Sequence, residues 1–141
     1  MEKDEHIGRI ISQIYRKGRI FFTKELAEYG LGSGQMMFLF QLYRKDGVTQ
    51  DELAHILYID KGTTARALNT LEKQNFIQRV TSEIDKRAKL IYLTDKAKKL
   101  QREIETVLES WEGNLTKSLD IDEEKQLKYL LSKVIDNSCL K

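Results

Sequence analysis

The chain has 141 residues, the size of one domain, and its 40% hydrophobic and 33% charged residues are typical of a globular protein. No apolar run approaches the roughly 18 residues of a membrane-spanning helix, and the first ten residues mix acids and bases, unlike a signal peptide. We therefore expect a cytoplasmic protein without membrane contact, and the absence of proline favours long helices.

Catalytic and metal-binding patterns are missing from the sequence. Cys139 is the only cysteine, which excludes an intrachain disulfide, and a thiol without a role is a simpler reading than a redox sensor. His6 and His55 are too far apart to form a familiar zinc pattern with it. Because there is no phosphate loop, paired carboxylate or Cys/His arrangement either, we expect neither an enzyme nor a cofactor.

Charge is distributed unevenly along the chain. Residues 60–99 contain ten Lys and Arg against five Asp and Glu, a charge of +5, whereas the whole chain carries only +2. A basic block of this kind suits a polyanion such as DNA, because neutralising phosphates releases their counterions. Charge alone is equally compatible with a solvated surface.

Two helices are predicted in the first third of the chain. Residues 7–29 repeat apolar side chains at intervals of three and four, which predicts a long amphipathic helix ending at Gly30. Residues 34–47 form a second, more apolar helix, with Ser33 as its N-cap and Gly47 as its end.

A helix-turn-helix is predicted next. Thr49 and Glu52 form a capping box that starts a short helix at 50–57, and Asp60 is placed to cap a further helix at 61–74. That helix ends near Asn75, a residue that tolerates left-handed backbone geometry.

The helix at 61–74 has two different faces. One is largely apolar and includes Ala67 and Leu68, while the other carries short polar and basic side chains, among them Arg66 and Asn69. Side chains of the second kind can reach base edges and phosphates in a major groove. The alternative is a pair of ordinary core helices with a solvated face.

The segment that follows favours the DNA-binding interpretation. β-like runs at 76–80 and 90–94 flank the charged loop "EIDKRAK" (83–89), which predicts a hairpin with an extended tip directly after the second helix. Helix, turn, helix, hairpin is the order of a winged helix, whose tip can lie in an adjacent minor groove.

The last third returns to helix, at 95–119 and 123–140, with long apolar stripes. Stripes at both ends of the chain need a partner surface, and a two-fold dimer is the commonest solution. The predicted fold is mainly α with a small β-hairpin wing: a winged helix-turn-helix flanked by N- and C-terminal dimerisation helices.

The sequence resembles the MarR (multiple antibiotic resistance regulator) family of winged-helix transcriptional regulators. The similarity covers nearly the whole chain. In "DKRAKLIYLT", Asp85 and Arg87 match the D-x-R of the family's wing and Leu93–Thr94 match its "LT", while "DKGTTARALNTLEKQNFIQR" resembles its recognition helix. Ala97 stands where many members have glycine.

The resemblance implies a homodimer that binds a pseudo-palindromic operator, usually as a repressor, and is released by a small phenolic or aromatic anion such as a salicylate-like compound. One domain, 1–141, would then hold a DNA-binding lobe at 31–99 between dimerisation helices at 1–30 and 100–141. The alternative is a winged-helix module for protein or RNA contact without ligand response.

Candidate site residues follow from these patterns. The predicted DNA contacts of the recognition helix are Lys61, Thr63, Thr64, Arg66, Asn69 and Thr70, joined by Thr49 and Gln50 at the preceding helix start. In the wing, Lys86, Arg87 and Lys89 are predicted to contact DNA while Asp85 orients Arg87 or pins the loop. Met36, Met37 and Phe40 are candidate apolar walls of a ligand pocket, with Arg16 or Lys17 meeting a carboxylate; plain core is the alternative.

Overall fold

The computed structural model describes residues 6–137, so Cys139 and the end of the last predicted helix lie outside the described residues. The first helix, α1, spans Ile7–Glu25 and is followed by a single 3-10 turn, Ala27–Tyr29. The prediction of one continuous helix over 7–29 is therefore wrong at its end. Leu26, between the two pieces, is fully buried.

Helix α2 spans Ser33–Arg44. Gly32, not Ser33, is its N-cap, and the backbone N–H of Gly32 donates to Oε1 of Gln35 at 3.0 Å. The helix ends before Gly47, whose positive φ of 73° turns the chain so that its N–H donates to the carbonyl of Ile91 at 2.7 Å. The sequence therefore placed both ends of this helix incorrectly.

Helices α3 (Gln50–Leu57) and α4 (Lys61–Lys73) form the predicted helix-turn-helix. The capping box is confirmed: Glu52 N–H donates to Oγ1 of Thr49 at 3.1 Å, and Thr49 N–H donates to Oε2 of Glu52 at 3.3 Å. Asn75 has the predicted left-handed geometry, with φ 63°. Tyr58, which ends α3, adopts it as well, with φ 55°.

The wing is an antiparallel hairpin of β2 (Ile77–Thr81) and β3 (Lys89–Leu93), each one residue away from its predicted bounds. A third strand, β1 (Val48–Thr49), pairs with the other edge of β3, giving the order β1-β3-β2. A strand of two residues is too short to show a hydrophobic periodicity, so β1 was not predicted. It joins the start of α3 to the wing through backbone hydrogen bonds.

The C-terminal third contains α5 (Asp95–Lys99), α6 (Gln101–Thr116) and α7 (Ile121–Asn137). The single helix predicted over 95–119 is interrupted at Leu100, which caps α5 and starts α6. Thr94 begins this region as an N-cap, accepting a hydrogen bond from Ala97 N–H at 3.2 Å.

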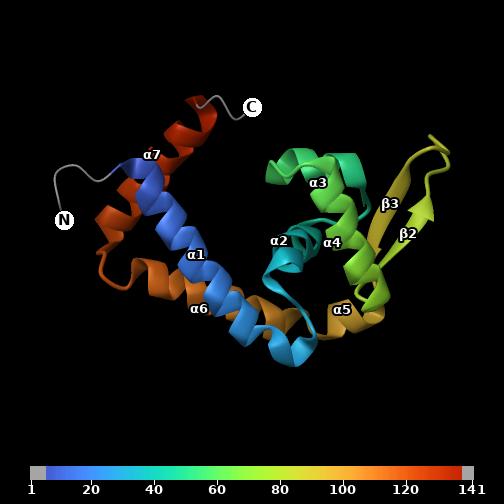
Figure 1. Ribbon diagram of the computed structural model, residues 1–141, viewed down its shortest axis with the longest axis horizontal. Coiled ribbons are helices and arrows are strands. Elements are labelled where there is room, and N and C mark those ends of the chain that lie inside the picture. Colours follow the sequence, from blue (N-terminus) through green and yellow to red (C-terminus); the bar gives the residue numbers. More distant parts are fainter. Residues whose placement is uncertain (1–5, 138–141) are drawn as a thin grey trace.

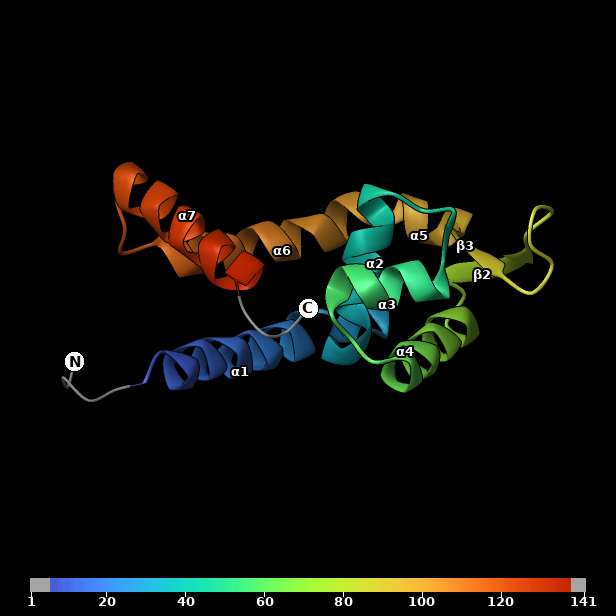
Figure 2. The same cartoon turned by 90° about the horizontal axis from the view of Figure 1, so that it is seen from above.

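The elements form a lobe and an extension. Helices α2, α3 and α4 pack with the wing at one end, while α1 and α6 run together away from them and α7 follows at the far end (Figure 1). Figure 2 shows the wing tip and α7 at opposite ends of the molecule. The buried core lies in the lobe and extends to the base of α1 and α6 through Phe22 and Ile104. The predicted fold class is confirmed.

The turn that precedes β1 can be tested at Gly47, with Gly30, a second glycine of positive φ, as the control. Ala at Gly30 (φ 72°) would have open space, whereas Ala at Gly47 would place its Cβ 3.1 Å from the Tyr92 ring. We expect Gly30→Ala to lower the free energy of unfolding by about 1 kcal/mol through backbone strain, and Gly47→Ala to lower it further. Urea titration measures both; equal losses would show that the Tyr92 contact imposes no constraint.

Candidate nucleic-acid interface

The start of α4 is organised by Asp60. Its carboxylate accepts from the Thr63 backbone N–H at 2.7 Å and from Thr63 Oγ1 at 2.8 Å, and Arg66 Nη2 in turn donates to Thr63 Oγ1 at 3.1 Å. The hydrogen bond from the Thr63 backbone is the main reason why the pKa of Asp60 lies below its ordinary value of 3.8. A carboxylate that stays ionised therefore sets the Thr63 and Arg66 side chains in place.

The predicted polar face of α4 is accessible along its length. Lys61, Thr63, Arg66 and Asn69 are exposed and Thr70 is half-buried, its Oγ1 donating to the Arg66 carbonyl at 3.1 Å. The opposite face, with Ala67, Leu68 and Leu71, is buried.

One candidate on α4 is wrong. Thr64 has 0% exposed surface and its Oγ1 donates to the Asp60 carbonyl at 2.8 Å, so it belongs to the core and cannot meet DNA. Its hydroxyl donates to a backbone carbonyl four residues earlier, as threonines within helices commonly do. Its place on the apolar stripe already indicated burial.

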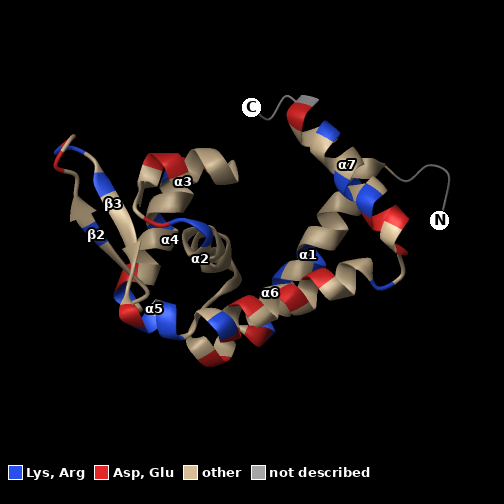
Figure 3. Cartoon of the chain, turned by 180° about the vertical axis from the view of Figure 1, so that it is seen from behind, with Lys and Arg blue, Asp and Glu red and all other residues tan. Residues whose placement is uncertain are grey.

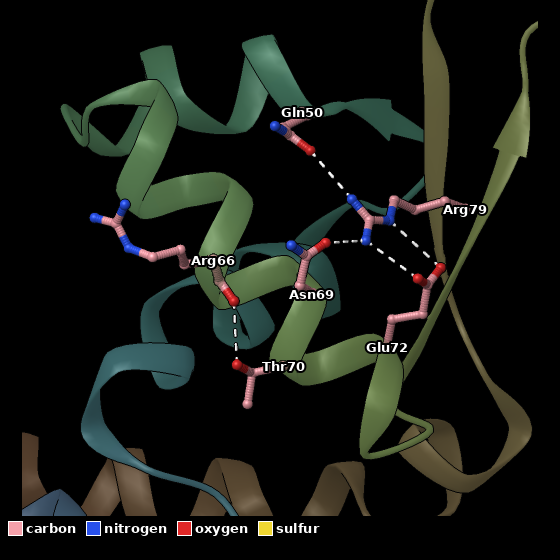
Figure 4. Close-up of polar contacts among 6 residues, drawn as sticks. All are labelled: Gln50, Arg66, Asn69, Thr70, Glu72 and Arg79. Atoms are coloured by element: carbon pink, nitrogen blue, oxygen red, sulfur yellow. Dashed lines mark hydrogen bonds and ion pairs between the residues drawn. The ribbon is translucent and has the colours of Figure 1, made fainter.

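Arg79, which the sequence analysis did not select, lies between α3 and α4 in the candidate interface. It projects from β2 toward both helices: Nη1 donates to Oε1 of Gln50 at 3.4 Å, and Nη2 donates to Oδ1 of Asn69 (Figure 4). The Glu72 carboxylate accepts hydrogen bonds from Arg79 Nη2 at 3.1 Å and from Arg79 Nε at 3.4 Å. The hydrogen bond from Arg79 lowers the pKa of Glu72 below its ordinary value of 4.5, so the pair is ionised at neutral pH.

The start of α3 lies beside this cluster. Thr49 and Gln50 are half-buried, and Thr49 Oγ1 is used in the capping box. Asp51 is exposed and lies 3.9 Å from Lys61 Nζ. Since Arg79 holds Gln50 as well as Asn69 and Glu72, strand β2 links the start of α3 and the second half of α4 to the wing.

The wing tip is a structured turn. Ser82, which is buried, accepts the backbone N–H groups of Ile84 and Asp85 at 3.2 Å each. Asp85 Oδ1 accepts the Arg87 N–H at 3.0 Å and lies 3.6 Å from Arg87 Nε. The expected geometry of Asp85 is therefore present, while the Arg87 side chain remains 94% exposed and Lys86 and Lys89 are exposed as well.

A separate pocket of about 650 Å³ lies where α1, α2, α3 and α6 meet. Met36, Met37 and Phe40 line it as predicted, together with Trp111. Arg16 and Lys17 do not line this pocket, because they line smaller depressions elsewhere along α1. The cation in the lining is Arg44, whose position at the last turn of α2 had no distinguishing signal in the sequence.

Known proteins resemble this chain over most of its length. Residues 31–89 match the model of the MarR family. The HTH-type transcriptional regulator BilQ of Clostridium symbiosum is 34% identical over 122 residues, which are 86% of this chain and 85% of that protein. The chain belongs to the MarR family. The HTH-type transcriptional regulator MgrA of Staphylococcus aureus is 32% identical over 117 residues, 83% of this chain and 78% of that protein.

Solved structures of MarR proteins agree with this assignment. A MarR transcriptional regulator from Methanosarcina mazei Go1 superposes with a TM-score of 0.88 at 39% identity, covering 93% of this chain and 94% of that one. A mutant MarR from E. coli in complex with operator DNA gives 0.81 at 27% identity, covering 91% and 92%. The chain is thus a DNA-binding transcriptional regulator of the MarR family.

Membrane-spanning helices and metal-binding clusters are both absent from the described part of the chain. Within residues 6–137, none of the helices combines the length and hydropathy of a transmembrane segment. Across the same residues, no three His, Cys, Asp or Glu side chains are arranged to hold a metal ion. The relatives are transcriptional regulators, a class that binds DNA instead of converting a substrate.

Proposed function

We propose that this MarR-family chain is a homodimeric repressor that binds a pseudo-palindromic operator and is released by a small aromatic anion. The observation that carries the proposal is the exposed polar face of α4 beside a basic wing. Lys61 and Arg66 lie on the helix, and Lys86, Arg87 and Lys89 lie on the hairpin. Figure 3 shows basic segments along the wing and α5.

The geometry suits a duplex. A major groove about 12 Å wide admits one helix, so α4 can enter it with Arg66 and Asn69 toward the base edges. The wing then reaches the neighbouring minor groove, where Arg87 contributes attraction. Thr49 and Gln50, at the start of α3, would then contact the phosphate backbone.

The dimer is proposed from apolar surface on the terminal helices. Every described side chain of α7 is exposed except Glu124, which is half-buried, and its apolar residues include Leu130, Val134 and Ile135. On α1, Ile7 and Ile20 are more than two-thirds exposed. A second copy that covers residues 1–30 and 100–141 would bury both stripes, and its α4 would lie about 34 to 36 Å away, one DNA turn.

The release mechanism is proposed from the pocket. Ile56 and Leu57 of α3 line it together with Trp111 of α6, so a bound molecule would touch both the DNA-binding lobe and the proposed dimer helices. Arg44 and Glu112 are the charged residues of the lining. An aromatic anion would direct its carboxylate to Arg44. It switches the protein only if it binds one arrangement of the helices more tightly than the other.

DNA binding is tested by titration with the duplex upstream of its own gene and a scrambled duplex of equal length. Arg66→Ala should cost about 1 to 3 kcal/mol on the first duplex and relax base preference. Lys86→Ala should weaken both duplexes alike and reduce the salt slope by about one, because it removes a phosphate contact. Unchanged affinity of Arg66→Ala would remove Arg66 from readout, and binding only to RNA would favour the alternative module.

The dimer is tested by analytical ultracentrifugation at micromolar concentration. The wild type should sediment as a dimer, and Leu130→Glu should shift it toward monomer because a charge would enter the apolar interface. Ile84→Glu makes the same change at the wing tip, where Ile84 is 100% exposed, and should leave the dimer intact. A monomeric wild type would contradict the proposal.

The pocket is tested by titrating salicylate against the fluorescence of Trp111, the only tryptophan in the chain. Salicylate should change this fluorescence and lower affinity for the operator duplex. Arg44→Gln should weaken salicylate binding about tenfold, as expected for loss of one charged hydrogen bond, and Arg16→Gln should not. If only Arg16→Gln lost salicylate binding, the anion would bind outside this pocket. If saturating salicylate left the affinity for the operator duplex unchanged, a ligand-operated switch would be excluded.

A further inference from the structure

Arg79 is a cation that is already paired with a carboxylate of the protein, Glu72. Its side chain is only 17% exposed, and two of its nitrogens face the two oxygens of Glu72 at 3.1 and 3.4 Å. A guanidinium paired in this two-point manner is held in one plane and largely neutralised. Arg79 therefore differs from Arg66 and Arg87, which are exposed, and it contributes little to long-range attraction of phosphate.

The remaining contacts of Arg79 fix the orientation of two amide side chains. A guanidinium has donors only, so the atom of Asn69 or Gln50 that faces it must be the oxygen. The nitrogens are then on the side away from Arg79, as Figure 4 shows. Within the described residues neither amide nitrogen donates to a protein acceptor, and Asn69 is exposed.

We propose that Arg79 is a positioning residue for DNA recognition: it holds Asn69 and Gln50 with their amide NH2 groups outward and so makes both side chains hydrogen-bond donors, Asn69 toward a base edge and Gln50 toward a phosphate. This inference rests on the proposed binding of DNA by α4. It adds a determinant of base preference that itself touches no base.

The donor orientation predicts which bases Asn69 selects. In the major groove guanine offers O6 and N7 as acceptors, thymine offers O4 and adenine offers N7, whereas cytosine offers only an amino donor. Asparagine's two-bond contact with adenine needs the amide oxygen as an acceptor as well, and the bond from Arg79 holds that oxygen turned toward the protein. We therefore expect a base with a major-groove acceptor opposite Asn69, namely guanine, thymine, or adenine through N7, and selection against cytosine.

The residues of this cluster come from three elements, so the arrangement depends on the shape of the side chain at position 79 as well as on its charge. Arg79 comes from β2, Gln50 from α3, and Asn69 and Glu72 from α4. Lysine at position 79 would keep the positive charge beside Glu72, but its single ammonium group has no planar fork to meet all three partners. Arg79→Lys thus separates the positioning role from charge.

The test is selection of bound sequences from randomised DNA duplexes by the purified full chain, for wild type, Arg79→Lys, Asn69→Ala and the double variant. Arg79→Lys should reduce preference at the base pair read by Asn69 by about fivefold or more, the low end of one base contact. Asn69→Ala should add little in the Arg79→Lys background, because both changes remove the same contact. The salt slope of Arg79→Lys should equal that of wild type.

Gln78→Ala is the matched control, since Gln78 is the exposed neighbour on β2 with its side chain on the other face of the strand. It should leave base preference intact, and the thermal unfolding midpoint of each variant identifies any loss of folding. A wild-type preference retained by Arg79→Lys, or effects of the two substitutions that simply add, would overturn this inference alone. A wild type that enriches no sequence would overturn the proposed function together with it.

Discussion

Burial of one stripe of α4 is the constraint on which the rest of the lobe depends. Leu68 and Leu71 have no exposed surface, and Thr64 joins them because its hydroxyl bonds to the helix backbone. A helix that commits this stripe to the core must turn the residues between its members outward. The exposure of Arg66 and Asn69 is thus a consequence of packing, and the same packing seats β2 against the helix.

Electrostatics then refines what packing has placed. Asp60 orders the first turn of α4 through Thr63, and Glu72 receives Arg79 near its end. Both carboxylates have a pKa below the ordinary value because they accept hydrogen bonds in the folded state. Glu72 is paired with Arg79, whereas Asp60 is exposed and is stabilised by hydrogen bonds from Thr63. In the proposed DNA-binding surface, these two acidic residues position the hydrogen-bond donors Thr63 and Arg79.

The pocket and the interface share helix α3. Its start carries Gln50 within the Arg79 cluster, and its end places Ile56 and Leu57 in the pocket wall. Small shifts of whole helices are a common mode of switching, so a displacement at one end of α3 can reach the other end. This shared helix gives the proposed ligand response a physical route, without contact between the ligand and the nucleic acid.

Local sequence patterns predicted much of this protein. The capping box at Thr49, the left-handed Asn75, the two faces of α4 and the wing hairpin each depend on residues within a few positions of one another. The errors are also local in kind: the ends of α1 and α2 were misplaced, and the break at Leu100 was missed because the apolar stripe continues across it.

The sequence by itself determined the fold class and the direction in which α4 faces, because periodicity and caps act over one or two helical turns. The motifs of the wing and of α4 also carried the resemblance to the family. Tertiary structure decided that Arg79 meets Asn69 and Gln50, and that Arg44 enters the pocket wall while Arg16 does not. These contacts join residues from separate elements. Their partners are selected by how helices and strands pack, which no short stretch of sequence encodes.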